Sequence, residues 1–359
     1  MTQPMTLAPE PLVRPQRKGP QNPETVLPAV ASDGSTERDR LRMMMLIRRF
    51  EERTFQEYTK PGQKIGGFCH LYSGQEAISV AMAANFQKGR DAMINAYRCH
   101  GHSLALGMSP HSAMAEMFGK ATGCSKGKGG SMHLFDAVNG NHGGHGIVGG
   151  HIPVAIGFAF AQWYQKTGGF TVCFFGDGAI NQGTFLESMN LASLYKLPVV
   201  YCVENNGVAM GTQVERHSAE RDLAKRGLGY NMPSRNVDGN DLDVLISEFA
   251  EARARGVAGE GPTFLSLNTF RFRGHSMSDP LKYRTKEQQE AAKARDPISL
   301  YEDRIRGKNA LNDEQYDAIA SEVRETIEDA VTRADSDPHP ALEDRFNDAL
   351  AEKYPYQWR

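Results

Sequence analysis

Two short polar sequences near the middle of the chain carry residues that could hold a metal ion and a phosphate group. The first is Gly176-Asp177-Gly178, and the second is the pair Asn205-Asn206, with the 26 residues 179–204 between them. A carboxylate and an amide oxygen are hard donors of the kind that Mg²⁺ prefers, and Mg²⁺ commonly takes one or two protein groups together with phosphate oxygens. The glycines beside Asp177 let the backbone approach a phosphate closely. These residue types predict a magnesium diphosphate site.

Both candidate ligands follow apolar runs that are typical of buried strands. Residues 170–175 lead into the Gly-Asp-Gly triplet, and residues 199–203, which follow Pro198, lead into the Asn-Asn pair. The segment between them has helical spacing, so the order is strand, helix, strand. Because ligands bind beyond the carboxyl ends of strands in open parallel sheets, Asp177 and Asn206 are expected to meet at one sheet edge. The apolar face of the helix should comprise Phe185, Leu186, Met189, Ala192 and Leu194.

The triplet at this distance from an Asn-Asn pair resembles the fingerprint of thiamine diphosphate enzymes. In that family the aspartate, the second asparagine and a carbonyl two residues later hold Mg²⁺ against the diphosphate. The resemblance therefore implies Asp177, Asn206 and the carbonyl of Val208 as metal ligands, with Gly176, Gly178 and Ala179 beside the cofactor. The alternative is an ordinary strand-helix-strand unit in which the Asp and Asn are turn residues and no metal or cofactor binds.

Two histidines are candidates for proton transfer. His70 lies in GGFCHLYSGQEA, on a loop before a predicted helix, and His275 lies in GHSMSDP, after the predicted strand 262–267. Imidazole is the usual proton shuttle near neutral pH, although an isolated histidine is more often structural. Both segments resemble active-site segments of the alpha subunits of 2-oxo acid dehydrogenases, and the second closely resembles that of pyruvate dehydrogenase alpha subunits. The resemblance implies catalytic roles for both, and a cofactor contact for His275.

Two further segments are implied to contact the cofactor. Tyr97 and Arg98 follow a helical stretch, and the family uses this Tyr-Arg pair at the diphosphate, where arginine can bind bidentately. The turn that contains Gly146 and Val148 looks like the backbone contact that the family makes to the aminopyrimidine. Residues 123–150 are otherwise glycine-rich loops, and their histidines lack the spacing of a structural zinc site.

The rest of the chain predicts a doubly wound α/β fold, with a mainly parallel sheet and helices on both faces. Helices are expected over 36–58, 152–164 and 241–255, and again from Thr285, where Gln288 completes a capping box. The helix over 152–164 is apolar throughout and is expected to pack tightly. The expected division is a disordered, proline-rich arm (1–35), a thiamine diphosphate-binding domain (36–340) and a C-terminal tail (341–359).

Composition narrows the class of protein. The chain has 359 residues and a formal net charge of −2, so no basic surface argues for nucleic acid, and no 18-residue apolar run argues for a membrane helix. The five cysteines form no CxxC motif and fit reduced, buried thiols. The N-terminal arm contains Glu10, Glu24 and Asp33, which a mitochondrial presequence would avoid. A cytoplasmic, bacterial location is expected.

The resemblance covers about residues 40 to 340 and four motifs in order. It implies oxidative decarboxylation of pyruvate with thiamine diphosphate and Mg²⁺, and transfer of the acetyl group to lipoyl on a dihydrolipoyl acetyltransferase. The family also needs a glutamate from a second domain type, so a separate beta subunit is expected in a heterotetramer of two alpha and two beta chains. Ser276 aligns with a serine that mammalian enzymes phosphorylate, but the run after Pro280 is one residue short of a second such serine.

Three alternatives remain at this stage. The chain could belong to a branched-chain 2-oxo acid or acetoin dehydrogenase, because motifs do not report the substrate pocket. It could be a non-catalytic assembly subunit, against which the joint presence of His70, Asp177, Asn206 and His275 argues. A nicotinamide dehydrogenase would need GxGxxG after an early strand, whereas the central unit reads GDGAINQG.

Overall fold

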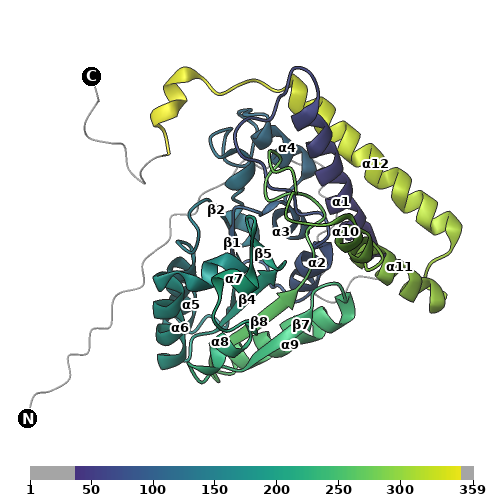
Figure 1. Ribbon diagram of the computed structural model, residues 1–359. Helices are drawn as coiled ribbons and strands as arrows, with labels where there is room; N and C mark the ends of the chain where they lie inside the picture. The colour runs from purple at the N-terminus through teal and green to yellow at the C-terminus, as the bar shows by residue number, and fades with distance from the viewer. Residues whose placement is uncertain (1–36, 349–359) are drawn as a thin grey trace, which may run out of the picture.

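The computed structural model describes residues 37–348, and its centre is a six-stranded, wholly parallel sheet (Figure 1). The strand order is β2-β1-β3-β4-β8-β7, and a separate antiparallel pair, β5-β6, follows β4 in the chain. The strands are β1 (Ala92–Ala96), β2 (Asn141–His145), β3 (Thr171–Gly176), β4 (Val199–Asn205), β5 (Val208–Ala209), β6 (Thr212–Gln213), β7 (Ser234–Asp238) and β8 (Thr263–Asn268).

Alternate residues of the central strands point into two cores on opposite faces of the sheet. Val172 and Phe174 of β3 lie in one core, which α2 (Glu76–Ala84) and α9 (Leu242–Val257) cover. Cys173 and Phe175 of the same strand lie in the other core, which α5 (Ile152–Tyr164) and α6 (Gly183–Leu194) cover. This two-residue period is what a strand buried on both faces requires.

A further layer of helices lies outside α2. The first helix, α1 (Glu37–Thr59), runs beside α12 (Asp313–Ser336), and both also contact the small helices near β1 (Figure 1). Within the described range, no helix is both long and apolar enough to cross a membrane. The other helices are α3 (His100–Ala105), α4 (Pro110–Met117), α7 (Val214–His217), α8 (Lys225–Leu228), α10 (Lys286–Lys293) and α11 (Pro297–Gly307), with 3₁₀ turns η1 (Gly130–Met132), η2 (Ala137–Asn139), η3 (Asp177–Asn181) and η4 (Leu342–Phe346).

The doubly wound parallel architecture predicted from the sequence is confirmed, as are the strand-helix-strand unit around Asp177 and the capping box at Thr285. Three strands of the sheet, β1, β2 and β7, were not predicted, and Tyr97 and Arg98 follow β1 rather than a helical stretch. The run Ala92–Ala96 has few of the β-branched residues that mark a strand, so its type is set by its neighbours in the sheet. The expected arm, 1–35, lies outside the described residues.

The packing predicted for α5 and α6 was wrong in part. In α5 the buried residues are Ile152, Ala155, Ile156 and Ala159, whereas Trp163 is 43% exposed. In α6, Leu186 and Leu194 also face away from the core. A helix that is apolar all round favours burial on every side, but the sheet of this chain covers only one side of it.

The glycine-rich loop after α4 is organised by one buried carboxylate. Glu116 accepts hydrogen bonds from the backbone N–H groups of Ser125 and Gly127 at 2.8 Å, of Gly129 at 2.7 Å and of Gly130 at 3.0 Å. Its side chain is fully buried. The loop therefore has a defined shape, because four N–H groups that no helix or strand satisfies find their acceptor on a single side chain.

Candidate cofactor and metal site

The loops that follow β1, β3 and β4 converge on a cavity of about 230 Å³ at the carboxyl edge of the sheet. The chain leaves β1 toward β2 on one side and leaves β3 toward β4 on the other, so this edge is the point where the strand order diverges. Ten of the residues predicted from the sequence line the cavity: Tyr97, Arg98, Val148, Gly176, Asp177, Gly178, Ala179, Asn206, Val208 and His275. Two predicted residues, His70 and Gly146, are not among the lining residues.

Asp177 and Asn206 lie at the ends of two adjacent parallel strands. Asp177 comes directly after β3 and is 1% exposed, and Asn206 comes directly after β4. The Oδ1 atom of Asn206 is buried and has no hydrogen-bond partner within the described chain. A buried amide oxygen without a donor is costly unless a ligand satisfies it, and a hard cation is such a ligand. The donor set therefore fits Mg²⁺.

The backbone around Asp177 leaves room only for glycine at one position. A Cβ atom at Gly178 would come 2.7 Å from the Cβ of Ala209, which is closer than two carbon atoms can approach. No heavy atom lies within 4 Å of a Cβ built at Gly176. Gly178 is therefore required by the close approach of β5, whereas Gly176 has open space beside the strand end. This arrangement fits a phosphate group that contacts backbone.

Two buried arginines give the cavity a positive lining. Arg98 donates to the carbonyl oxygens of Leu71, at 2.5 Å, and His275, at 2.8 Å. Arg271 is 1% exposed and lines the same cavity. Burial and, after it, the charge of Arg271 lower the pKa of Arg98 to about 10. Two cations that repel each other in a buried cavity favour an anionic ligand between them, such as a diphosphate.

His70, Tyr97 and His275 form one ring cluster beside this cavity. The ring of His70 lies 4.4 Å from that of Tyr97 and 5.1 Å from that of His275, measured between centroids. Burial and the nearby charge of Arg98 lower the pKa of His70 to about 2 and that of His275 to about 4. Both imidazoles are therefore neutral near pH 7, and His70 Nδ1 is buried without a partner in the described chain.

Several lining residues were not predicted from the sequence. Arg271 lies in the loop between β8 and the GHSMSDP segment. The nearby Arg273 turns away from the cavity and lies over the ring of Phe55, 4.3 Å from the centroid. Glu204 directly precedes the Asn-Asn pair and accepts a 2.6 Å hydrogen bond from the hydroxyl of Tyr72. The only sequence signal for Glu204 was its place directly after the predicted strand 199–203. Gln75 and His151, which also line the cavity, had no such signal.

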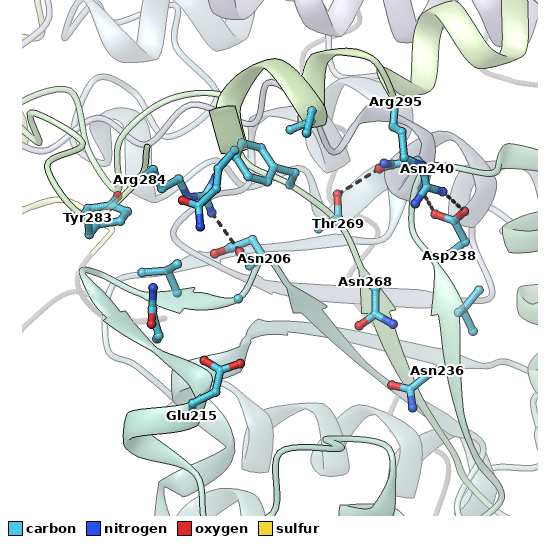
Figure 2. A pocket seen from close by; sticks show the side chains of 18 residues that line it. Asn206, Glu215, Asn236, Asp238, Asn240, Asn268, Thr269, Tyr283, Arg284 and Arg295 are labelled. Atoms are coloured by element: carbon cyan, nitrogen blue, oxygen red, sulfur yellow. Dashed lines mark hydrogen bonds and ion pairs between the residues drawn. The ribbon is translucent and has the colours of Figure 1, made fainter. Parts of the chain in front are cut away.

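A larger polar cleft of about 810 Å³ adjoins the cavity and shares Asn206 and Val208 with it. Figure 2 shows the guanidinium of Arg284 directed at Asn206, with Thr269 and Asn240 farther along the cleft. The cleft lies beyond the ends of β4, β8 and β7. The candidate metal ligand Asn206 is thus reached from two sides, by the enclosed cavity and by this wider opening.

Comparison with known proteins decides the family. The model of the family described as "Dehydrogenase E1 component" matches residues 42–343, which is most of the chain. The chain belongs to the dehydrogenase E1 component family. This E1 family is thiamine diphosphate-dependent, so the resemblance drawn from the sequence motifs is confirmed.

Curated E1 relatives match nearly the whole chain. "Pyruvate dehydrogenase E1 component subunit alpha" of Rhizobium meliloti is 46% identical over 310 residues, covering 86% of this chain and 88% of the relative. The protein of the same name from Zymomonas mobilis is 41% identical over 338 residues, covering 92% and 94%. The somatic, mitochondrial form from Bos taurus is 43% identical over 307 residues, covering 84% and 76%.

Proposed function

We propose that this chain is the alpha subunit of a pyruvate dehydrogenase that decarboxylates pyruvate oxidatively and passes the acetyl group to lipoyl on a dihydrolipoyl acetyltransferase. The observation that carries the proposal is the convergence of Asp177, Asn206 and two buried arginines on one cavity, in a chain similar along most of its length to pyruvate dehydrogenase alpha subunits. The convergence argues against a subunit that only supports assembly, because such a subunit has no need of it.

The residues present fit Mg²⁺ and thiamine diphosphate. Asp177, Asn206 and the carbonyl of Val208 would hold Mg²⁺, and Arg98 with the N–H groups after Gly176 would hold the diphosphate. When bound, thiamine diphosphate supplies the nucleophilic carbon and the electron sink for decarboxylation. The chain would supply the anchor: the Asp177 carboxylate and the Asn206 amide oxygen would bind the metal, and the guanidinium groups would bind the diphosphate.

The neutral imidazoles of His70 and His275 are the groups that would stabilise a reacting 2-oxo acid by hydrogen bonding. With a pKa of about 2 and about 4, neither carries a charge at working pH. Each can therefore donate an N–H hydrogen bond to the substrate's oxygen atom as a neutral imidazole. Arg98 fixes the loop of His275 by its 2.8 Å hydrogen bond to the His275 carbonyl, so the anion anchor and the imidazole move together.

An exposed apolar surface supports a partner subunit. The outer sides of α5 and α6 expose Phe160, Trp163 and Leu194, and the ring of Tyr195 lies 6.1 Å from that of Trp163. The two helices lie side by side (Figure 1). Ile147, on the loop that leads into α5, is 77% exposed. A contiguous apolar surface of this kind marks an interface, and we infer that a beta subunit covers it, completes the active site and forms an α₂β₂ heterotetramer.

The test is dye-linked oxidation of pyruvate by the chain alone and with its beta partner, with thiamine diphosphate and Mg²⁺ present. We expect activity only with both chains, and far less with branched-chain 2-oxo acids or acetoin. Full turnover by this chain alone would overturn the shared active site. Preference for another 2-oxo acid would change the substrate assignment and leave the chemistry intact.

A further inference from the structure

His217 contacts the metal-binding aspartate from a part of the chain that the proposed mechanism does not use. It is the last residue of α7, and its Nε2 atom lies 3.2 Å from Oδ2 of Asp177. Asp177 is almost completely buried, and His217 is largely buried as well. The contact joins the end of β3 to a short helix that follows the β5-β6 pair.

The hydrogen bonds around His217 decide which ring nitrogen carries the proton. Arg226 donates from Nη2 to Oδ1 of Asn181 at 3.1 Å, which fixes the orientation of that amide. The Nδ2 group of Asn181 therefore donates, and it lies 3.0 Å from the carbonyl of His217 and 3.2 Å from its Nδ1 atom. The hydroxyl of Ser218 also lies 3.0 Å from Nδ1. Because Nδ1 accepts, the proton is on Nε2 and is donated to Asp177.

This donation occupies one of the two carboxylate oxygens. With Oδ2 bound to the imidazole, Asp177 would have Oδ1 left for a cation and would act as a monodentate ligand. Mg²⁺ demands a compact, nearly octahedral shell, for which a single oxygen from each carboxylate is suitable. Removing a neighbour that orients a metal ligand in this way typically weakens metal affinity about 10- to 100-fold.

We propose that His217 is a positioning residue that holds Asp177 in the orientation required to bind the divalent cation, and that Asn181 and Arg226 in turn hold His217. His217 would touch neither cofactor nor substrate. The proposal rests on the proposed function, since it requires that Asp177 is a metal ligand. It also extends the metal site to α7 and α8, because Arg226 belongs to α8 and His217 to α7.

The test is a titration with Mn²⁺, followed by electron paramagnetic resonance, of the assembled alpha–beta complex with saturating thiamine diphosphate. His217→Ala should weaken Mn²⁺ binding about 10- to 100-fold. His217→Gln should restore most of the affinity, because a glutamine amide can donate to Asp177. Asn181→Leu leaves the imidazole in place and should weaken binding less.

The matched control is His111→Ala. His111 also bonds an aspartate, Asp337, at 2.7 Å, but neither of these two residues lines the cavity. This variant should bind Mn²⁺ like the wild type. If His217→Ala and Asn181→Leu both keep wild-type affinity while Asp177→Asn loses it, the positioning role is wrong. If Asp177→Asn also keeps full affinity, the metal site itself is wrong.

Discussion

Arg284 donates a hydrogen bond from Nη2 to the backbone carbonyl of Asn206 at 2.9 Å. Its Nη1 atom donates to the carbonyl of Arg271 at 2.7 Å, and its guanidinium lies 3.7 Å from the centre of the Phe270 ring. One side chain thus joins the loop after β4, which carries the proposed metal ligand Asn206, to the loop after β8, which carries the buried Arg271 of the cavity. Nothing in the sequence around Arg284 distinguishes it from a surface arginine.

Replacing Arg284 by lysine should weaken binding of thiamine diphosphate with Mg²⁺. Lysine keeps the charge, but a single ammonium cannot bond two carbonyls and lie over an aromatic ring in the same geometry. We expect a loss of about 10-fold in affinity, measured by calorimetric titration of the assembled complex. Arg273→Lys is the control, because Arg273 lies over Phe55 and does not line the cavity. Equal losses in the two variants would contradict the role given to Arg284.

The depressed pKa values of His70 and His275 should make the folded chain less stable in acid. Both pKa values, about 2 and about 4, lie below the ordinary value of 6.5, so the unfolded chain binds protons that the folded chain excludes. Stability should be full above about pH 6.5 and fall as the pH drops toward 4, and for His70 further toward 2. Urea unfolding at pH 7 and pH 5 measures this change.

The same experiment on His70→Asn and His275→Asn separates the two groups from other acid effects. Each variant removes a titrating ring and should therefore lose less stability than the wild type between pH 7 and pH 5. Identical pH dependence in the wild type and both variants would show that the rings are protonated equally in the folded and unfolded chains.

Glu116→Gln should destabilise the fold and loosen the glycine-rich loop. Each oxygen of Glu116 accepts hydrogen bonds from two backbone N–H groups. In glutamine an NH₂ group would replace one of these oxygens, so at least two N–H donors would be left without an acceptor. A cost of about 3 kcal/mol is expected in the free energy of unfolding. Glu314→Gln, at an exposed position of α12, should cost less than about 0.5 kcal/mol. Hydrogen exchange that stays slow over residues 123–130 in Glu116→Gln would argue against the account.

Trp163→Arg and Leu194→Arg should prevent assembly without unfolding the chain. Both side chains are on the exposed apolar surface of α5 and α6, where an added charge meets solvent in the free chain but would be buried in an interface. Light scattering after mixing with the beta subunit should show separate chains, while circular dichroism of the free variant stays unchanged. Normal heterotetramers from both variants would place the interface elsewhere.

Much of the fold follows from the sequence, because the central strands are long, apolar and followed by polar residues. The same pattern placed Asp177 and Asn206 at adjacent strand ends, and the structure brings them to one cavity. The strand β1 escaped prediction because its alanine-rich sequence carries little preference, so its partners in the sheet decide its conformation.

The residues that the sequence could not provide are those whose importance depends on distant partners. Arg284 reaches Asn206 across 78 positions, and Tyr72 reaches Glu204 across 132. No local pattern encodes such a contact. Conversely, α5 was predicted to be buried on all sides because its sequence is apolar throughout. Such a sequence does not distinguish burial within one chain from burial against another chain.

The most direct test of the central claim is a calorimetric titration of thiamine diphosphate into the assembled alpha–beta complex, with and without Mg²⁺, for the wild type and Asp177→Asn. The wild type should bind tightly only when Mg²⁺ is present, because Asp177 and Asn206 hold the diphosphate through the metal. The Asp177→Asn complex should lose this Mg²⁺-dependent binding. Unchanged, Mg²⁺-dependent affinity in the variant would contradict the assignment of the cavity as the cofactor site.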